Sequence, residues 1–175
     1  MKKIFEYSII VFLLMFSSCL KENIPLSNSR EDYLGDQLRI DGFYHQITKD
    51  GYIVNAVFYY RNGILFQILI HSEFSNPADF VSLLTKERIE LYRKGKYNWG
   101  IFKIKGNEFL SEHWETPTQG NYLATITRAG EILSDTSYVI TKYINSQRGL
   151  AGGGDSYWYF YPFSPKPDST NVFIK

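Results

Sequence analysis

The chain has little cysteine, no clustered charge of one sign and no apolar run long enough to cross a membrane. Cys19 is its single cysteine, so no disulfide can form within the chain and no cysteine-rich metal site is available. The 19 Lys and Arg residues nearly balance the 18 Asp and Glu residues, and the net charge is +1. Because binding to phosphate backbones needs clustered Lys and Arg, we expect no nucleic-acid partner.

Motifs of common catalytic chemistry are missing too. GLAGGGD at 149–155 lacks the Lys-Ser/Thr of a P-loop and precedes an aromatic run, so we interpret it as a flexible loop and a possible lid at a rim. No G-x-S-x-G is present. His45, His71 and His113 lie on three separate predicted strands without the spacing of a metal motif. We therefore predict no metal site and no cofactor.

Four carboxylates lie nearest to aromatic residues and are considered as acid–base candidates: Glu108, Glu112, Glu115 and Asp135. Glu108 and Glu112 would stand about 13 Å apart on an extended strand. That separation exceeds the range of both retaining and inverting glycosidases. We therefore predict no catalytic residues, while a glycan-acting hydrolase remains an alternative.

The N-terminus is typical of an export signal. Lys2 and Lys3 precede an apolar stretch at 9–16, which is far shorter than the roughly 20 residues that span a bilayer. Ser17 and Ser18 then lead directly to Cys19. We predict a removable signal peptide over 1–18.

The stretch MFSSCLKEN at 15–23 resembles the lipobox of bacterial lipoproteins. The resemblance implies that the Cys19 thiol is diacylated, that cleavage precedes Cys19, and that this residue anchors the mature protein in a membrane. Two or more acyl chains are enough for stable anchoring. In many lipoproteins an Asp directly after the acylated cysteine retains the protein at an inner membrane. The residue at this position here is Leu20. Lys21-Glu22 resembles the export signals of Bacteroidetes surface lipoproteins, so we expect the outer membrane, with the leaflet open.

After this anchor, 19–37 is polar and predicts a tether, and 38–175 predicts one antiparallel β domain with a C-terminal tail. Asn62-Gly63 is a strong hairpin signal and predicts a type I′ turn. The predicted strands cover 38–48, 52–60, 64–70, 98–106, 108–115, 121–128, 131–144 and 156–163. Asn76 as N-cap, Pro77 and a helical apolar stripe predict one helix over about 77–93.

About eight sequential strands with tight turns predict an antiparallel meander, closed into an up-and-down barrel that leaves no free sheet edge. This order of elements, with the Gly42-Phe43-Tyr44 opening, resembles lipocalin-like (calycin) barrels over 38–163. The helix lies between the third and fourth strands, unlike the helix of lipocalins. A curved open sheet packed on the helix is the alternative.

Aromatic residues are abundant, with 14 Tyr, 13 Phe and 3 Trp, and several strands are apolar on both faces. One interpretation is a pocket that binds a small apolar or amphipathic ligand. Its predicted lining residues are Tyr44, Phe66, Trp99, Trp114, Tyr138 and Trp158. The other interpretation is a filled core whose outer surface binds another envelope protein.

Overall fold

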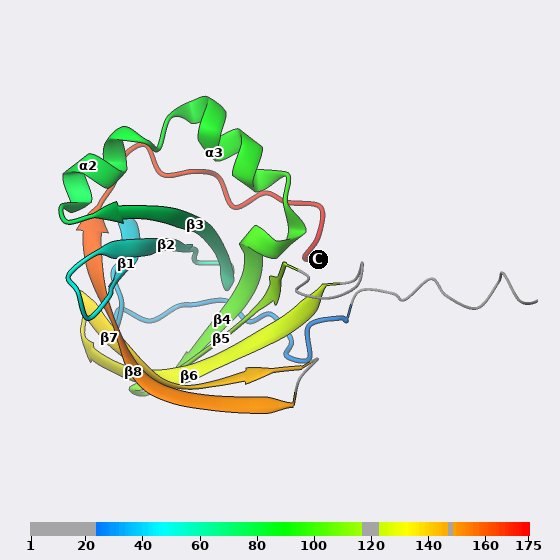
Figure 1. Cartoon of the computed structure of the whole chain (residues 1–175). Helices are drawn as coiled ribbons and strands as arrows, with labels where there is room; N and C mark the ends of the chain where they lie inside the picture. Colours follow the sequence, from blue (N-terminus) through cyan, green and yellow to red (C-terminus); the bar gives the residue numbers. More distant parts are fainter. Residues whose placement is uncertain (1–23, 117–122, 147–148) are drawn as a thin grey trace, which may run out of the picture.

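The computed structural model describes residues 24–116, 123–146 and 149–175, and it is a closed antiparallel barrel of eight strands (Figure 1). Each strand pairs with its neighbours in sequence, and β8 pairs with β1 to close the sheet. The predicted barrel is thus confirmed, and the open sheet is excluded. The strands are β1 Gly42–Ile47, β2 Ile53–Tyr59, β3 Ile64–Phe74, β4 Trp99–Lys105, β5 Glu108–Glu115, β6 Ala124–Ser134, β7 Ser137–Asn145 and β8 Leu150–Pro162.

The hairpin between β2 and β3 forms where it was predicted, with a different turn. Gly63 N–H donates to the Tyr60 carbonyl, and Gly63 has φ +72°. No non-glycine residue in the described part of the chain has positive φ, so Asn62 does not adopt the type I′ conformation. A type I turn followed by a left-handed glycine gives the same reversal.

The helical segment differs from the single helix predicted over 77–93. It consists of α2, Pro77–Ser82, and α3, Lys86–Arg93. Asn76 caps α2 as expected, and its side chain accepts a hydrogen bond from Ala78 N–H. Thr85 caps α3 in turn, because its hydroxyl accepts from Arg88 N–H at 3.3 Å. This second cap ends the first helix and starts another. A short 3₁₀ turn, η1 Lys96–Asn98, then leads into β4.

Two apolar cores lie on opposite faces of the sheet. The inner core lies inside the barrel, and it includes Tyr44, Val57, Tyr59, Leu65, Phe102, Phe109, Tyr138 and Trp158. The outer core lies between the outer face of β1–β4 and the covering elements, α2, α3 and the C-terminal tail (Figure 1). It includes Phe43, Phe58, Phe66, Phe80, Ile89 and Trp99, with Phe163, Phe173 and Ile174 of the tail packed against it. This arrangement explains why several strands are apolar on both faces.

One end of the barrel is closed by residues 30–41, which cross it before β1. Tyr33 N–H donates to the carbonyl of Arg61 in the β2–β3 turn, and Arg39 N–H donates to the carbonyl of Asp135 in the β6–β7 turn. Tyr33 is 6% exposed, and its ring lies 5.5 Å from that of Phe102. We call this the closed end. We call the opposite end, where β1, β3, β5 and β7 finish, the mouth.

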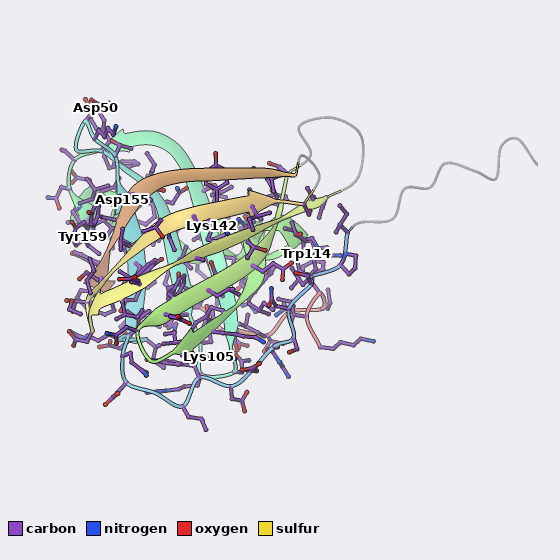
Figure 2. All side chains as sticks on the ribbon, turned by 90° about the horizontal axis from the view of Figure 1, so that it is seen from below. Asp50, Lys105, Trp114, Lys142, Asp155 and Tyr159 are labelled. Atoms are coloured by element: carbon purple, nitrogen blue, oxygen red, sulfur yellow. The ribbon has the colours of Figure 1, made fainter. Side chains whose placement is uncertain are left out.

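The described part of the predicted tether, 24–37, does not lead away from the domain. It runs along the outside of β4 and β5 from the mouth to the closed end (Figures 1 and 2). The folded domain therefore includes residues from Ile24 onward. The signal peptide and Cys19 lie outside the described residues. No helix in the described part of the chain has both the length and the apolar character needed to cross a bilayer.

Candidate functional site: the barrel interior around Arg128

The inner lining changes from apolar to polar between the closed end and the mouth. On paired strands β5 and β6, Phe109 lies opposite Gly130, Ser111 opposite Arg128, and His113 opposite Ile126. On β1 and β2, Tyr44 lies opposite Val57, and the next inward pair is Gln46 with Asn55. Since alternate residues of a strand share one face, these register positions all point into the barrel. Polar side chains therefore gather in the half nearer the mouth.

Stacked aromatic rings occupy the half nearer the closed end. The ring of Tyr138 lies 4.6 Å from Phe109 and 5.7 Å from Trp158, both in stacked orientation, and 5.3 Å from Tyr44. The hydroxyls of Tyr59 and Tyr138 lie 2.6 Å apart and share a hydrogen bond. Burial raises the pKa of each of these two tyrosines, so both stay protonated at neutral pH.

Arg128 is a cation inside this lining. Its Cζ lies 5.8 Å from the ring centroid of Trp158 on β8. Its charge also lies close enough to Tyr59 and Tyr138 to lower their pKa values slightly against the effect of burial. Burial lowers the pKa of the guanidinium itself, while the field of Glu115 opposes that shift. No hydrogen bond or ion pair joins the guanidinium to any described residue.

Three amide side chains of the mouth half have partners, in contrast to Arg128. Asn55 donates to Gln46 at 2.7 Å, Gln67 donates to the Tyr97 carbonyl at 2.9 Å, and Asn145 donates to Glu115 at 2.7 Å. These hydrogen bonds pair the three amide side chains and do not involve the guanidinium of Arg128.

Two buried polar atoms near Arg128 have no hydrogen-bond partner among the residues that the structure describes. They are Nε1 of Trp158, which is 2% exposed, and Nδ1 of His113, which is 3% exposed. Burial and the charge of Arg128 both lower the pKa of His113 well below its usual value, so its imidazole is neutral. Indole N–H can only donate. The guanidinium of Arg128 and the indole N–H of Trp158 are therefore two neighbouring donor groups without an acceptor among the described residues.

The six residues predicted to line a pocket do not share one space. Tyr44, Tyr138 and Trp158 belong to the inner core and lie beside Arg128 or the tyrosine pair. Phe66, Trp99 and Trp114 belong to the outer core. The prediction could not separate the two sets because both faces of these strands are apolar.

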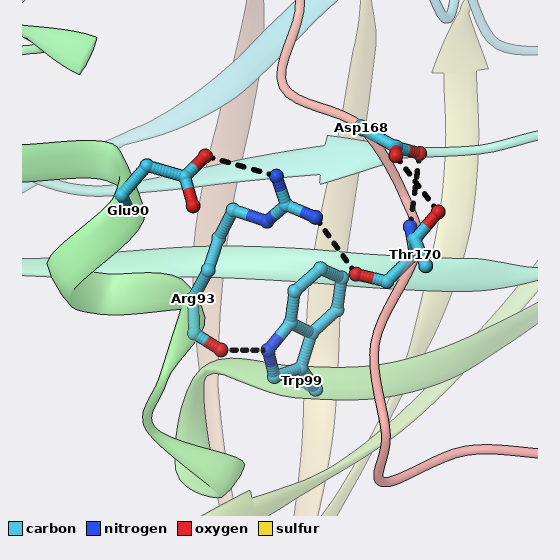
Figure 3. Close-up of polar contacts among 5 residues, drawn as sticks. All are labelled: Glu90, Arg93, Trp99, Asp168 and Thr170. Carbon is cyan, nitrogen blue, oxygen red and sulfur yellow. Dashed lines mark hydrogen bonds and ion pairs between the residues drawn. The ribbon is translucent and has the colours of Figure 1, made fainter. Parts of the chain in front are cut away.

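The outer tryptophans are tied to covering segments rather than to an open cavity. Trp99 Nε1 donates to the Arg93 carbonyl at 2.8 Å, and Arg93 binds Glu90 of α3 and the Thr170 carbonyl of the tail (Figure 3). Trp114 Nε1 donates to the Ile24 carbonyl at 2.8 Å. Their role is to hold α3, the tail and the N-terminal segment on the barrel.

Glu112 has a structural role that the sequence analysis missed. It is 0% exposed, and its carboxylate accepts from Ser27 N–H at 2.8 Å and Oγ–H at 2.9 Å. It also accepts from Asn28 N–H at 2.8 Å and Nδ2–H at 2.9 Å. Because all four donors come from the N-terminal segment, we call this set of bonds the Glu112 latch. A carboxylate so enclosed is poorly placed for acid–base work on a substrate.

Arg128 was also missed, although one signal was available. Ile126 and Arg128 lie on the same face of the predicted strand 121–128, so a charged side chain occupies a face that is otherwise apolar. Among the described residues, no three His, Cys, Asp or Glu side chains form a group that could hold a metal ion. His45 lies on the outer side beside Tyr159, whereas His113 faces inward. The side chain of His71 lies outside the described residues.

Comparison with known proteins adds no assignment. No family model matches the chain, and neither a search of the curated proteins nor one of the solved structures found a match. The functional argument therefore depends on the geometry of the barrel.

Proposed function

We propose that this chain is an envelope lipoprotein, anchored through acylated Cys19, whose barrel binds a small amphipathic anion without chemical conversion. The anionic group would pair with Arg128, and the apolar part would pack against neighbouring aromatic rings such as that of Trp158. The unpaired guanidinium inside the barrel is the observation that carries this proposal.

A cation that is partly removed from bulk water and left unpaired is energetically costly, and Arg128 is half-buried. Folding retains it at low cost only if another group, such as the anion of a ligand, completes the pair. The planar guanidinium fork matches carboxylate and phosphate oxygens in a bidentate geometry. An anionic ligand would thus remove the cost that the unpaired guanidinium carries.

The donors around Arg128 support an anion over a neutral ligand. In the Tyr59–Tyr138 pair one hydroxyl donates to the other, and the accepting hydroxyl retains its own proton for a third group. The N–H of Trp158 is a further donor without a partner. A carboxylate or a phosphate monoester offers the acceptors that these groups lack.

Binding is a better proposal than glycan hydrolysis. Glycosidases need two carboxyl groups facing one cleft. Glu112 is enclosed by its latch, and Glu115 is engaged by Asn145. Neither arrangement favours proton transfer to a sugar.

Calorimetric titration with dodecanoate and dodecanol tests the proposal, since the two probes differ only in the anionic group. We expect dodecanoate to bind at least about tenfold more tightly, because a hydrogen bond to a charged group contributes about 1.5–3 kcal/mol. Arg128→Met should abolish this preference, whereas Lys142→Met, which removes an exposed charge from β7, should preserve it (Figure 2). Equal binding of both probes by the wild-type chain and Arg128→Met would overturn the proposal.

The outer surface of β6 and β8 favours a second candidate, contact with another envelope protein. Leu133, Tyr157 and Tyr159 are 54%, 43% and 41% exposed, and Tyr159 lies at the surface in Figure 2. Exposed aromatic groups of this kind favour protein contacts. Crosslinking in cells through a photoreactive residue at position 157 tests this candidate, and an absence of any crosslinked protein counts against it.

A further inference from the structure

The N-terminal segment is fixed at the mouth of the barrel. Ile24 N–H donates to the carbonyl of Leu123, the residue before β6, at 3.1 Å. The Ile24 carbonyl accepts from Trp114, one residue before the end of β5, at 2.8 Å. Both strand termini lie at the mouth, and Figure 2 shows Trp114 where the N-terminal segment reaches the barrel. The segment then passes to the closed end.

The Glu112 latch makes this attachment strong. Four donors on one buried carboxylate are charge-assisted hydrogen bonds, which are about twice as strong as neutral ones. Releasing the segment would leave the Glu112 charge in contact with apolar neighbours such as Ile101 and Trp114 on the same face. Lys103 adds an ion pair with Glu31 of the segment at 2.5 Å. The segment therefore moves with the barrel rather than acting as a tether.

The segment that links Cys19 to the attached residue Ile24 is short. Five peptide steps separate Cys19 from Ile24, and a fully extended chain covers at most about 3.6 Å per step, or about 18 Å. An acylated Cys19 lies at the membrane surface. Ile24, and with it the mouth, must then stay within about 20 Å of the headgroups.

A groove beside this attachment has the chemistry of a membrane contact. It has a volume of about 610 Å³ and lies between the N-terminal segment and the tail on the outside of β4 and β5. Leu26, Trp114, Phe173 and Ile174 supply apolar surface and Lys96 supplies positive charge, while Arg30 lies at the far end of the groove, beside Gly63 of the β2–β3 turn. Lys96 Nζ lies 4.3 Å above the ring of Trp114. No Asp or Glu side chain is among the described residues that line the groove.

We infer that the Glu112 latch, by fixing the N-terminal segment to the barrel, holds the mouth of the barrel against the bilayer. The groove is then in contact with anionic lipid headgroups. Basic side chains near a membrane are attracted to anionic lipids by about 1 kcal/mol each, and tryptophan favours the interface. An amphipathic anion could then pass between the leaflet and Arg128 without crossing bulk water. This inference rests on acylation of Cys19, and its transfer step rests on the proposed binding function.

The orientation can be measured on the full acylated chain in vesicles of phosphatidylcholine with phosphatidylglycerol. A fluorophore is placed at Lys94→Cys, near the mouth, or at Asn107→Cys, in the β4–β5 turn at the closed end; both positions are exposed. Headgroup-labelled quencher lipids report which position is near the membrane. We expect at least about threefold stronger quenching at position 94, because the link to Cys19 holds the mouth within about 20 Å of the headgroups, whereas position 107 lies at the opposite end of the barrel.

A spacer variant provides the control. Inserting about 20 Gly and Ser residues before Ile24 keeps the latch but frees the barrel from the membrane. Quenching at position 94 should then fall toward that at position 107, and should partly return when phosphatidylglycerol is increased. Equal quenching of the two positions without the spacer, or no membrane association at all, would overturn the inference.

The binding proposal is tested apart from the membrane. Dodecanoate titration of the Cys19→Ala chain in solution reports on Arg128 alone. If that binding is intact while both labels quench equally, the orientation is wrong and the binding proposal stands. If the labels differ but dodecanoate does not bind, the mouth still faces the membrane and the proposed transfer of a ligand is wrong.

Discussion

The guanidinium of Arg128 lies 5.8 Å from the ring centroid of Trp158, and the indole Nε1 of Trp158 has no hydrogen-bond partner in the described part of the chain. Two donor groups thus face the same interior without an acceptor. A natural core avoids such a pair unless a bound group completes it. This relationship connects the fold to the proposed function.

Removing the charge should therefore stabilise the empty protein. We expect Arg128→Met to raise the free energy of unfolding by about 1 kcal/mol, because replacing an unpaired, half-buried charge by an apolar side chain often stabilises a protein. Urea denaturation of the ligand-free Cys19→Ala chain measures the change. A loss of more than about 1 kcal/mol would show that Arg128 is held by favourable contacts and needs no ligand.

The tyrosine pair should act as a unit. Tyr59→Phe or Tyr138→Phe leaves one buried hydroxyl without its partner and should cost about 1–3 kcal/mol of stability. The double variant loses both hydroxyls and should cost clearly less than the sum of the single changes. Denaturation of all four proteins gives the coupling, and strict additivity would contradict the shared hydrogen bond.

Removal of the Glu112 carboxylate should release the N-terminal segment. We expect Glu112→Ala to lower the free energy of unfolding by at least about 2 kcal/mol, since four donors lose a charged acceptor. Cleavage by a protease between 24 and 37 should also accelerate. Glu108→Ala is the matched control, because Glu108 lies exposed on the same strand and should change neither property.

Stability should fall on acidification through the two buried histidines. Burial lowers the pKa of His45 from 6.5 to about 4, and the pKa of His113 is lowered as well. The unfolded chain binds these protons first, so stability is complete above pH 6.5 and is lost as the pH falls toward 4. His45→Gln should reduce this loss by about 1–2 kcal/mol, as measured by urea denaturation across this range. An unchanged pH profile in that variant would assign the loss to other groups.

Local signals predicted the barrel well where the turns are short. Asn62-Gly63 and Gly106-Asn107 both mark hairpins, and Asn76-Pro77 starts a helix. The positive φ of Gly63 and of Gly106 is a requirement that sequence shows directly. The closure of β8 on β1 follows from the need to pair every edge.

Glycines inside strands misled the prediction in the second half of the barrel. The predicted strands 121–128 and 131–144 leave a break at Ala129-Gly130, but β6 continues through it to Ser134, and the register shifts there by a bulge. A Cβ on Gly130 would lie 1.8 Å from the Val139 carbonyl oxygen, so glycine is needed for close strand approach. The Gly-rich run likewise belongs to β8 rather than to a lid, and Gly152 makes room for the ring of Tyr143.

The site itself depends on contacts between distant parts of the sequence. Glu112 accepts hydrogen bonds from Ser27 and Asn28, which precede it in the sequence by 85 and 84 positions. No local sequence pattern encodes that pairing. Arg128 becomes unusual only when β5, β7 and β8 enclose it. The sequence thus predicted the strands of the barrel. The unpaired charge of Arg128 could be recognised only in the three-dimensional structure.

Native mass spectrometry of the gently purified Cys19→Ala chain, made in a bacterial periplasm, tests the central claim most directly. We predict a reproducible extra mass that is released on denaturation, belongs to an amphipathic anion and is absent from Arg128→Met. An unliganded mass for the wild-type chain that persists when dodecanoate is added, or an identical bound mass in both proteins, would contradict the assignment of Arg128 as the site of binding.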